Sequence, residues 1–275
     1  MNDFSCYTNS TLTQLRDKWN MRHPDAPIRS SDPREIHKQL EMHLRDTCSS
    51  NEACWLKQSN AFGGTLDAKK IENQSFAPEH PKEWNHKPNA WLSSVDITKV
   101  MKQYESAYHC FEFLGPSPID FDKKEVDGEC VWQELCSFQL AEMQRKGKFK
   151  IGIIFNTDVN SGPGEHWISL FINLKTKLIF FFDSTGDPMP PEVKRFIRRV
   201  VKQGKHLSPP IAFTVDDNEG AEHQHGDTEC GVYSLFFIVN MLEDKTTKEY
   251  LKTHLIRDEE MQKFRKIYFN DPSLL

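Results

Sequence analysis

Three residues of this chain carry the side-chain groups of a catalytic site built on a cysteine thiol. Each of them stands at one end of an apolar run. His166 opens one such run, Asp183 follows the next, and Cys230 opens a third. An imidazole beside a thiol can take its proton, and a carboxylate behind the imidazole fixes its tautomer and stabilises its charged form. We therefore predict that Cys230 is a nucleophile, that His166 is its base and that Asp183 orients that base.

The apolar runs also predict the elements that bring these side chains together. Residues 166–172 and 178–182 are expected to be the two strands of a hairpin, joined by a turn at 173–176. In a hairpin the start of one strand lies beside the end of the other, so His166 and Asp183 are expected to be neighbours. The glycine-containing segment 162–164 predicts a flexible loop before the histidine that can admit a substrate.

Cys230 begins a segment, residues 230–242, that is apolar on nearly every side and is expected to be a buried helix. The positive end of the helix dipole favours the thiolate form of a cysteine at that position. Gln224 lies in the polar loop just before the helix. We predict that its side-chain amide, with the backbone N–H of Cys230, stabilises the oxyanion that forms on attack.

The rest of the chain predicts an α+β fold with a central, mostly antiparallel sheet flanked by helices. The chain has 275 residues, a net charge of −5 and ordinary apolar and charged fractions, as expected of a folded protein. Residues 1–88 are expected to be a mainly helical N-terminal extension, because Asp32 can cap a helix with an apolar stripe, and residues 89–275 a catalytic domain. Three further helices are expected: one capped by Asp96, one at 131–144 and one opened by Pro190 and Pro191. Two further strands are expected, at 150–155 and 211–215.

Seven cysteines, odd in number and unevenly spaced, do not indicate a disulfide framework, and a reducing compartment is expected. Cys48, Cys54, Cys130 and Cys136 are expected to be single thiols. No segment has the composition of a secretion signal or a membrane span. The basic residues of 194–202 are expected to form the solvated face of a helix, so nucleic acid is not expected as a partner, except as an activator.

Two other kinds of function remain as alternatives. His223, His225, Glu229 and Cys230 carry the imidazole, carboxylate and thiolate groups that zinc prefers. No second pair of ligands lies at metal-finger spacing, so neither a metal nor any other cofactor is predicted. The other alternative is a binding module without catalysis, although every position of the predicted site carries a chemically competent residue.

The order of these residues, on strand, strand, loop and helix, resembles a known family. The segments 164–167 (GEHW), 182–186 (FDSTG) and 224–233 (QHGDTECGVY) are similar to motifs of the adenain-like peptidases, which include the SUMO-specific proteases and virion-maturation proteases of large DNA viruses. The resemblance covers roughly residues 90 to 242. It implies a cysteine endopeptidase that acts on a protein substrate.

The resemblance extends to a pair of tryptophans. The segment 91–97 (WLSSVDI) is similar to the one with which SUMO proteases line a narrow tunnel, and the second wall there is the tryptophan after the catalytic histidine. The resemblance therefore implies that Trp91 and Trp167 clamp a Gly-Gly pair. Only residues without a side chain pass between two indole faces, so the tunnel selects by exclusion. The alternative is that both are core aromatics.

Within the family, the helical extension and the segments 155–158 (FNTD) and 228–230 (TEC) resemble the polyprotein-processing proteases of African swine fever virus and related large DNA viruses. This implies cleavage at Gly-Gly-X sites of viral structural precursors during virion maturation, in the host cytoplasm and the virion. The loop segment 227–229 departs from the usual SUMO-protease pattern. A SUMO-specific or ubiquitin-like-specific isopeptidase is the alternative.

Overall fold

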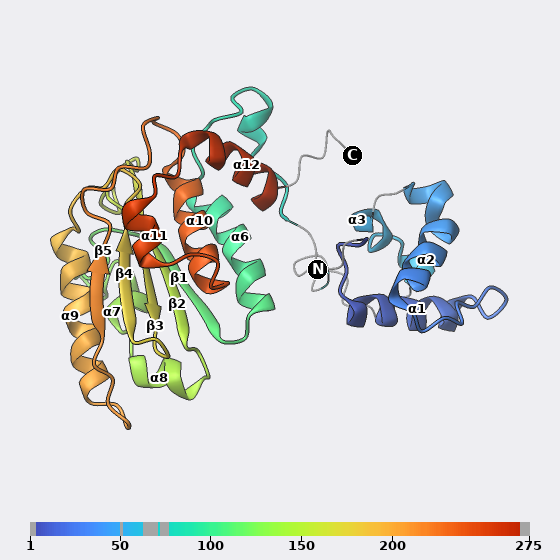
Figure 1. Cartoon of the computed structure of the whole chain (residues 1–275), viewed down its shortest axis with the longest axis horizontal. Coiled ribbons are helices and arrows are strands. Elements are labelled where there is room, and N and C mark those ends of the chain that lie inside the picture. The colour runs from blue at the N-terminus through green and yellow to red at the C-terminus, as the bar shows by residue number, and fades with distance from the viewer. Residues whose placement is uncertain (1–3, 50–51, 63–70, 72–76, 270–275) are drawn as a thin grey trace. The chain divides into compact units, whose positions relative to one another are not determined.

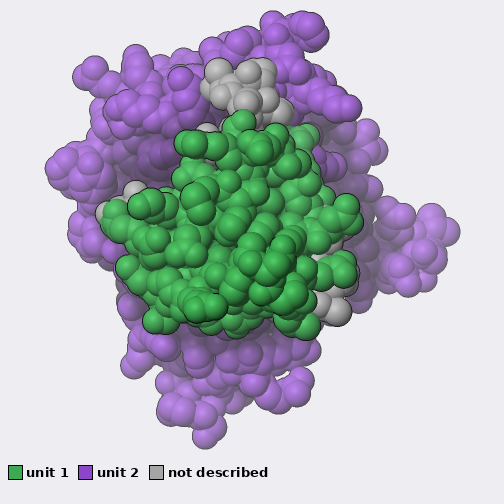
Figure 2. Space-filling view, turned by 90° about the vertical axis from the view of Figure 1, so that its right-hand side faces the viewer, with its two compact units in different colours: residues 1–79, 270–275 green, residues 80–269 purple. Residues whose placement is uncertain are grey.

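The computed structural model describes residues 4–49, 52–62, 71 and 77–269, and the chain divides into two compact units. One unit comprises residues 1–79 with 270–275 and the other residues 80–269, which Figure 2 shows in different colours. Residues 80–88 therefore belong to the same unit as the predicted site. The assignment of one part as an extension and the other as the catalytic domain stays a prediction.

The first unit is helical, as expected. Its helices are α1 (Asn9–Arg22), α2 (Pro33–Cys48) and the short α3 (Glu52–Trp55) and α4 (Ser59–Phe62). Asp32 caps α2 by accepting a hydrogen bond from the backbone N–H of Arg34 at 3.1 Å. The apolar stripe of α2 is buried in a core of its own, together with Leu12, Leu15 and Trp19 of α1.

The second unit is built on a sheet of five strands in the order β1-β2-β3-β4-β5 (Figure 1). The strands are β1 (Phe111–Pro118), β2 (Lys150–Asn156), β3 (Trp167–Asn173), β4 (Leu178–Phe182) and β5 (Thr214–Asp217). The central pairs β2–β3 and β3–β4 are antiparallel, whereas β1 and β5 join the edges in parallel. The α+β architecture is confirmed, and its sheet is antiparallel in the middle and parallel at both edges.

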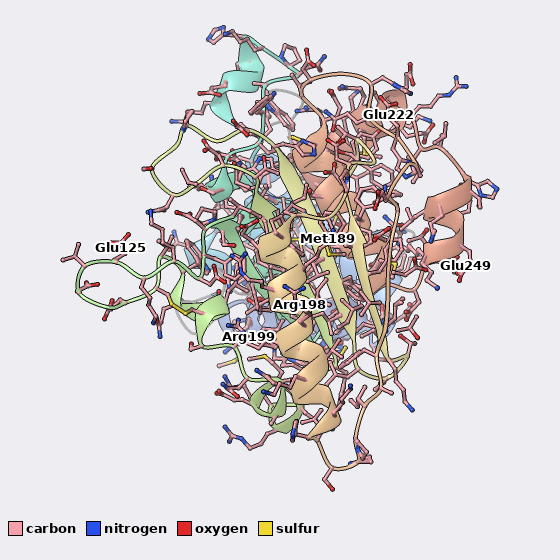
Figure 3. The ribbon with its side chains drawn as sticks, turned by 90° about the vertical axis from the view of Figure 1, so that its left-hand side faces the viewer. Glu125, Met189, Arg198, Arg199, Glu222 and Glu249 are labelled. Atoms are coloured by element: carbon pink, nitrogen blue, oxygen red, sulfur yellow. A yellow bond between two sulfur atoms is a disulfide. The ribbon has the colours of Figure 1, made fainter. Side chains whose placement is uncertain are left out.

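Helices cover both faces of this sheet. One face carries α6 (Ser94–Ala107), α10 (Cys230–Leu242), α11 (Lys248–Thr253) and α12 (Asp258–Tyr268). The other carries α7 (Gln133–Cys136), α8 (Leu140–Arg145) and α9 (Pro191–Lys205), and Figure 3 shows α9 lying across the sheet. A short 3-10 helix, η1 (Lys82–Asn85), precedes α6. Because successive strand side chains alternate, Phe180 and Phe182 join one core and Ile179 and Phe181 the other.

Three predicted elements differ in detail. The expected helix at 131–144 is broken into α7 and α8, because Gln203 of α9 accepts from the backbone N–H of Leu140 at 2.6 Å and donates to the carbonyl of Phe138 at 3.0 Å. The expected strand at 211–215 is β5, which begins later, at Thr214. Ser93, not Asp96, is the N-cap of α6, and Asp96 completes its capping box.

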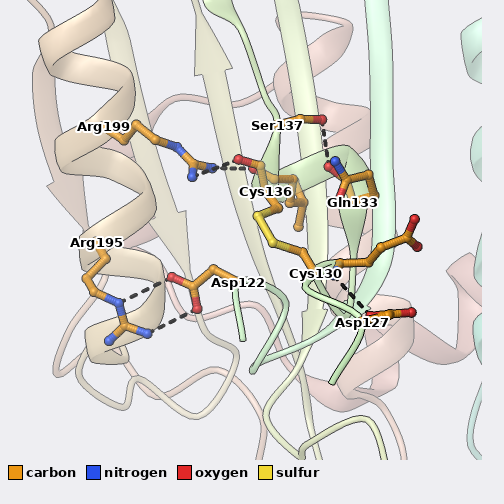
Figure 4. Close-up of a disulfide and its surroundings, with 10 residues drawn as sticks. Asp122, Asp127, Cys130, Gln133, Cys136, Ser137, Arg195 and Arg199 are labelled. Atoms are coloured by element: carbon orange, nitrogen blue, oxygen red, sulfur yellow. Dashed lines mark hydrogen bonds and ion pairs between the residues drawn. A yellow bond between two sulfur atoms is a disulfide. The ribbon is translucent and has the colours of Figure 1, made fainter. Parts of the chain in front are cut away.

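The prediction that four cysteines are single thiols is wrong. Disulfides join Cys48 to Cys54, with a Cα–Cα distance of 5.5 Å, and Cys130 to Cys136, with a Cα–Cα distance of 6.2 Å. Figure 4 shows the second of them. Both bonds are local, because the chain turns back at the end of α2 and again at α7. An odd number of cysteines therefore did not exclude disulfides, because each disulfide closes its own short loop of the chain. Cys6, Cys110 and Cys230 are free.

Among the helices that the structure describes, none has the length and apolar character needed to cross a bilayer. The glycines at 63 and 64, which the sequence places in a connecting segment, lie outside the described residues.

Candidate active site

His166 and Asp183 meet at one edge of the sheet. His166 directly precedes β3 and Asp183 directly follows β4, and the antiparallel register pairs Ser169 with Phe182. This register places the start of β3 beside the end of β4. Nε2 of His166 lies 2.7 Å from Oδ1 of Asp183. The structure thus brings together the imidazole and the carboxylate that the sequence singled out.

Asp183 is held in a buried setting, with 4% of its surface exposed. Its Oδ1 also accepts hydrogen bonds from the backbone N–H of Thr185 at 3.0 Å and from the Thr185 hydroxyl at 2.8 Å. Because all three donors converge on one oxygen, the carboxylate has a fixed direction toward His166.

A buried asparagine that the sequence did not single out fixes the backbone of Asp183. Oδ1 of Asn218 accepts from the Asp183 N–H at 2.9 Å, and its Nδ2 donates to the Asp183 carbonyl at 2.7 Å. Asn218 is 1% exposed and also donates to the carbonyl of Ala221 at 3.2 Å. In the sequence this residue reads as part of a polar turn, and nothing in its local pattern indicates the pairing.

Cys230 is the first residue of α10, and its thiol is one of the groups that raise the pKa of His166. Since Nε2 of the imidazole faces Asp183, Nδ1 is the nitrogen left for the thiol. Cys230 is 2% exposed and the His166 side chain 21% exposed, so the approach to the sulfur is narrow. Asp183, His166 and Cys230 thus form a line in which the first contact is a hydrogen bond and the second is an electrostatic influence on the imidazole.

The electrostatics of this line favour a charged imidazole. Burial lowers the pKa of His166, but the hydrogen bonds and charges of Asp183 and Cys230 outweigh burial and raise that pKa to about 10. His166 is therefore an imidazolium at neutral pH.

The side-chain amide of Gln224 is oriented by Ser184, the residue after Asp183. The Ser184 hydroxyl donates to Oε1 of Gln224 at 2.7 Å, and Nε2 of Gln224 donates to the carbonyl of Gly226 at 2.6 Å. The Ser184 carbonyl accepts from the backbone N–H groups of His223 and Gln224, both at 2.8 Å. A side-chain amide has two N–H donors, so Gln224 has one more beyond the bond to Gly226.

The two predicted tryptophans have different surroundings. Trp167 is 8% exposed, and its Nε1 donates to the carbonyl of Leu92 at 3.0 Å. A Cβ placed on Gly231 would lie 3.1 Å from Cβ of Leu92 and 3.3 Å from Cδ1 of Trp167, so these groups pack closely against the residue after Cys230. Trp91 is 43% exposed, so the core-aromatic alternative is wrong for Trp91.

The segment before His166 is tied down, contrary to the flexible loop expected. Oδ2 of Asp158 accepts from the Gly164 N–H at 2.9 Å, and Oδ1 of Asn156 accepts from the Glu165 N–H at 3.0 Å. The His166 carbonyl accepts from the Thr157 N–H at 2.8 Å. These bonds fix the backbone that carries the imidazole, and the glycine serves the turn through its φ of +91°.

The residues proposed as zinc ligands have other contacts in the structure. Nδ1 of His223 accepts from the Ile256 N–H at 3.1 Å, and burial lowers the pKa of this histidine. Glu229 pairs with Arg265 at 3.4 Å, and the Cys230 thiol raises the pKa of His166. Across the described residues, no group of three or more histidine, cysteine or acidic side chains is arranged to hold a metal ion.

A mixed sheet with a thiol at a helix start, and an imidazole and a carboxylate at the adjoining sheet edge, is the arrangement of a cysteine protease. Residues 144–274 match the Ulp1 protease family, C-terminal catalytic domain. The chain is a cysteine-type protease, and this part of it is similar to that family.

Viral proteases are among the relatives of this chain. A protein of Acanthamoeba polyphaga mimivirus, named as a thiol protease, is 29% identical over 265 residues, which are 95% of this chain and 83% of the relative. A cysteine protease of African swine fever virus is 29% identical over 186 residues, 65% of this chain and 67% of the relative. The crystal structure of the African swine fever virus protease covers 98% of this chain and 93% of its own, with a TM-score of 0.64 and 20% identity, which shows a shared fold.

Proposed function

We propose that this chain is a cysteine endopeptidase that cleaves proteins after Gly-Gly or at Gly-Gly-X sites and processes viral structural precursors during virion maturation. The observation that carries the catalytic part is the line from Asp183 through His166 to Cys230, with a bond of 2.7 Å at its first step and a charged imidazole at its centre. We place the activity in the host cytoplasm and in the virion, with a structural precursor as the protein partner.

In the proposed reaction, the Cys230 sulfur attacks the scissile carbonyl carbon and the carbonyl oxygen becomes an oxyanion. The second N–H of Gln224 and the Cys230 N–H stabilise this oxyanion, because first-turn N–H groups of a helix have no intrahelical acceptor. His166 gives its proton to the leaving amine as the peptide C–N bond breaks, which leaves a thioester. His166 then takes a proton from a water molecule as the water oxygen attacks the thioester carbon. The C–S bond breaks, the electron pair returns to the Cys230 sulfur, and the product leaves as a carboxylic acid.

Each remaining residue has a separate role in this proposal. Asp183 keeps Nε2 of His166 in place and stabilises the charged ring during both proton transfers. Trp91 and Trp167 are the walls of the substrate passage, and three facts support this. Trp91 is 43% exposed, Trp167 is fixed through the carbonyl of Leu92, and both Leu92 and Trp167 pack on the residue after the nucleophile.

A second candidate is a SUMO-specific or ubiquitin-like-specific isopeptidase. The family that matches is the Ulp1 protease family, and relatives from several African swine fever virus isolates are named SUMO-1 cysteine proteases. Both candidates use the same chemistry and the same Gly-Gly selection. They differ in whether a large folded partner must dock beside the cleavage site.

A paired digestion tests both candidates. Wild-type protein and Cys230→Ala are incubated with a viral structural precursor that contains Gly-Gly-X and, separately, with a SUMO precursor whose Gly-Gly is followed by a short tail, and the new termini are read by mass spectrometry. We expect wild-type protein to cut the viral precursor after Gly-Gly or Gly-Gly-X and Cys230→Ala to cut neither. Cleavage of the SUMO precursor alone would replace the first candidate by the second, and cleavage by Cys230→Ala would remove the proposed nucleophile.

A further inference from the structure

Arg265 of α12 is a buried cation whose contacts lie outside its own helix. It is 3% exposed, and burial lowers its pKa against the opposing charge of Glu229. Nη1 donates to the carbonyl of Ala90 at 3.0 Å, and Nη2 donates to the carbonyl of Thr228 at 2.9 Å. The guanidinium also lies 4.7 Å above the ring of Trp84.

These two carbonyls flank two parts of the candidate site. Ala90 directly precedes Trp91, and Thr228 and Glu229 directly precede Cys230. One planar guanidinium therefore joins the segment that carries the exposed tryptophan to the segment that carries the thiol. Figure 1 shows α12 beside the start of α10, and the bond to Ala90 adds the segment before α6 to this contact.

The backbone around Trp91 is anchored on both sides. Before it, the Ala90 carbonyl accepts from Nη1 of Arg265 and from Nε1 of Trp84, each at 3.0 Å. After it, the Leu92 carbonyl accepts from Nε1 of Trp167 at 3.0 Å. The position of the exposed indole therefore depends on Arg265 on one side and on the residue following His166 on the other.

The acid that pairs with Arg265 belongs to the same network. Glu229 is 4% exposed and lies 3.4 Å from Nη2 of Arg265. Its Oε1 accepts from the Thr228 hydroxyl at 2.8 Å and from Nε2 of Gln262 at 2.9 Å. Gln262 and Arg265 are i, i+3 neighbours on α12, so the same face of this helix binds the loop before Cys230 through both side chains.

A buried ion pair contributes little net stability compared with apolar packing of the same volume. The pair of Arg265 with Glu229 has a further structural effect. The remaining N–H donors of Arg265 hold the carbonyls of Ala90 and Thr228, which lie close in sequence to Trp91 and Cys230. We propose that Arg265 is a positioning residue that sets the distance between the Trp91 wall and the Cys230 loop, and thereby the width of the substrate passage. This inference rests on the proposed function, since it explains how Gly-Gly is selected over residues with side chains.

Arg265→Lys tests this role, because a lysine keeps the charge beside Glu229 but cannot hold both carbonyls in the planar fork of a guanidinium. The readout is the ratio of kcat/KM for a Gly-Gly-X peptide to that for the matching Ala-Gly-X peptide. We expect kcat/KM for Gly-Gly-X to fall about ten-fold or more, since small displacements of a site are costly, and the ratio to fall with it. The alkylation rate of Cys230 by iodoacetamide is expected to change little, because the contact to His166 is intact.

Arg199→Lys is the matched control. Arg199 on α9 is also a guanidinium whose pKa burial lowers, and it donates to the carbonyls of Leu135 and Cys136, on the other face of the sheet (Figures 3 and 4). Arg199→Lys removes the same kind of contact, a guanidinium bonded to two backbone carbonyls, at a place away from the candidate site. We expect a comparable drop in the thermal midpoint for both variants and a changed peptide ratio for Arg265→Lys alone.

The outcomes separate the two proposals. If wild-type protein cleaves Gly-Gly-X and Arg265→Lys keeps the wild-type peptide ratio, the positioning role is overturned and the proposed function stands. If wild-type protein cleaves no Gly-Gly-X substrate, both are overturned. Should Arg265→Lys not fold, Gln262→Met removes a donor to Glu229 without unpairing the arginine, and the inference then requires a smaller fall of the same ratio; an unchanged ratio overturns it.

Discussion

Oδ1 of Asp183 is hydrogen-bonded to Nε2 of His166 at 2.7 Å. Two further donors, the backbone N–H and the hydroxyl of Thr185, bind the same oxygen and fix the direction of the carboxylate. The carboxylate therefore acts on the ring in one geometry. Burial lowers the pKa of the ring, but the hydrogen bond and charge of Asp183, with the contribution of Cys230, outweigh burial and raise that pKa. In the proposed function, this ring is the proton donor for the leaving group.

Asp183→Asn is expected to lower kcat on the order of 10²- to 10⁴-fold, since an amide neither stabilises the imidazolium nor selects the productive tautomer. The buried position and the bonds to Thr185 suit an amide oxygen, so the fold is expected to survive. Steady-state kinetics with circular dichroism measure both effects. Activity within a few-fold of wild type would assign the orienting role to another acid.

The titration of His166 is a second test, best read from its ring proton signals by NMR. We expect a midpoint near the pKa of about 10 in wild-type protein, a lower value in Cys230→Ala, which keeps only Asp183, and a lower one again when Asp183 is also replaced by Asn. A folded-state pKa raised above the ordinary 6.5 means that the stabilisation is complete below pH 6.5 and is lost as pH rises toward 10. A wild-type midpoint at 6.5 would show that the ring is not held by these partners.

Asn218→Ala is expected to destabilise the protein by about 1–3 kcal/mol, because it leaves the N–H and carbonyl of Asp183 buried without partners. Since Asn218 fixes the backbone of Asp183, the residue proposed to orient His166, we expect kcat to fall more than KM rises. Urea unfolding and peptide kinetics on the same preparation measure the two effects. A loss of stability with unchanged kcat would reduce Asn218 to a structural residue.

The central part of the site could be predicted because its geometry is local. His166 and Asp183 flank two strands joined by a short turn, so the hairpin register alone determines that they meet. The start of α10 is equally local, since an apolar run begins at Cys230. Periodicity and turn chemistry are sufficient for such relationships.

The supporting residues could not be predicted because their partners are distant in the sequence. Asn218 bonds to a residue 35 positions away, Ser184 to one 40 positions away, and Arg265 to one 175 positions away. In isolation, each is a polar residue in a turn or on a helix. Strand β1 was missed for another reason: Gly115 and Pro116 interrupt its pattern, and an edge strand tolerates them at a register shift.

The division of the cysteines into free thiols and disulfides gives a prediction that does not depend on catalysis. Alkylation of the unfolded protein without reductant is expected to label three thiols, those of Cys6, Cys110 and Cys230, and reduction is expected to expose the four others. Intact mass before and after reduction counts them. Seven labelled thiols without reductant would restore the single-thiol expectation drawn from the sequence.

Ser184→Ala tests how the oxyanion donor is oriented. The Ser184 hydroxyl donates to Oε1 of Gln224 and Nε2 of Gln224 donates to the Gly226 carbonyl, so loss of the hydroxyl removes one of the two side-chain bonds that orient this amide. We expect kcat to fall about ten-fold with little change in KM, whereas Gln224→Ala, which removes the donor outright, is expected to lower kcat by about 10²- to 10³-fold.

The control for this variant is Ser169→Ala. Ser169 is another fully buried serine, on β3, and its hydroxyl has no hydrogen-bond partner in the part of the chain that the structure describes. Loss of that hydroxyl is expected to leave both kcat and KM unchanged. Because both substitutions remove one buried oxygen from the same unit, a fall in kcat for Ser184→Ala alone isolates the orientation of Gln224. Equal effects would attribute the loss to packing, and no effect of Gln224→Ala would place the oxyanion donors elsewhere.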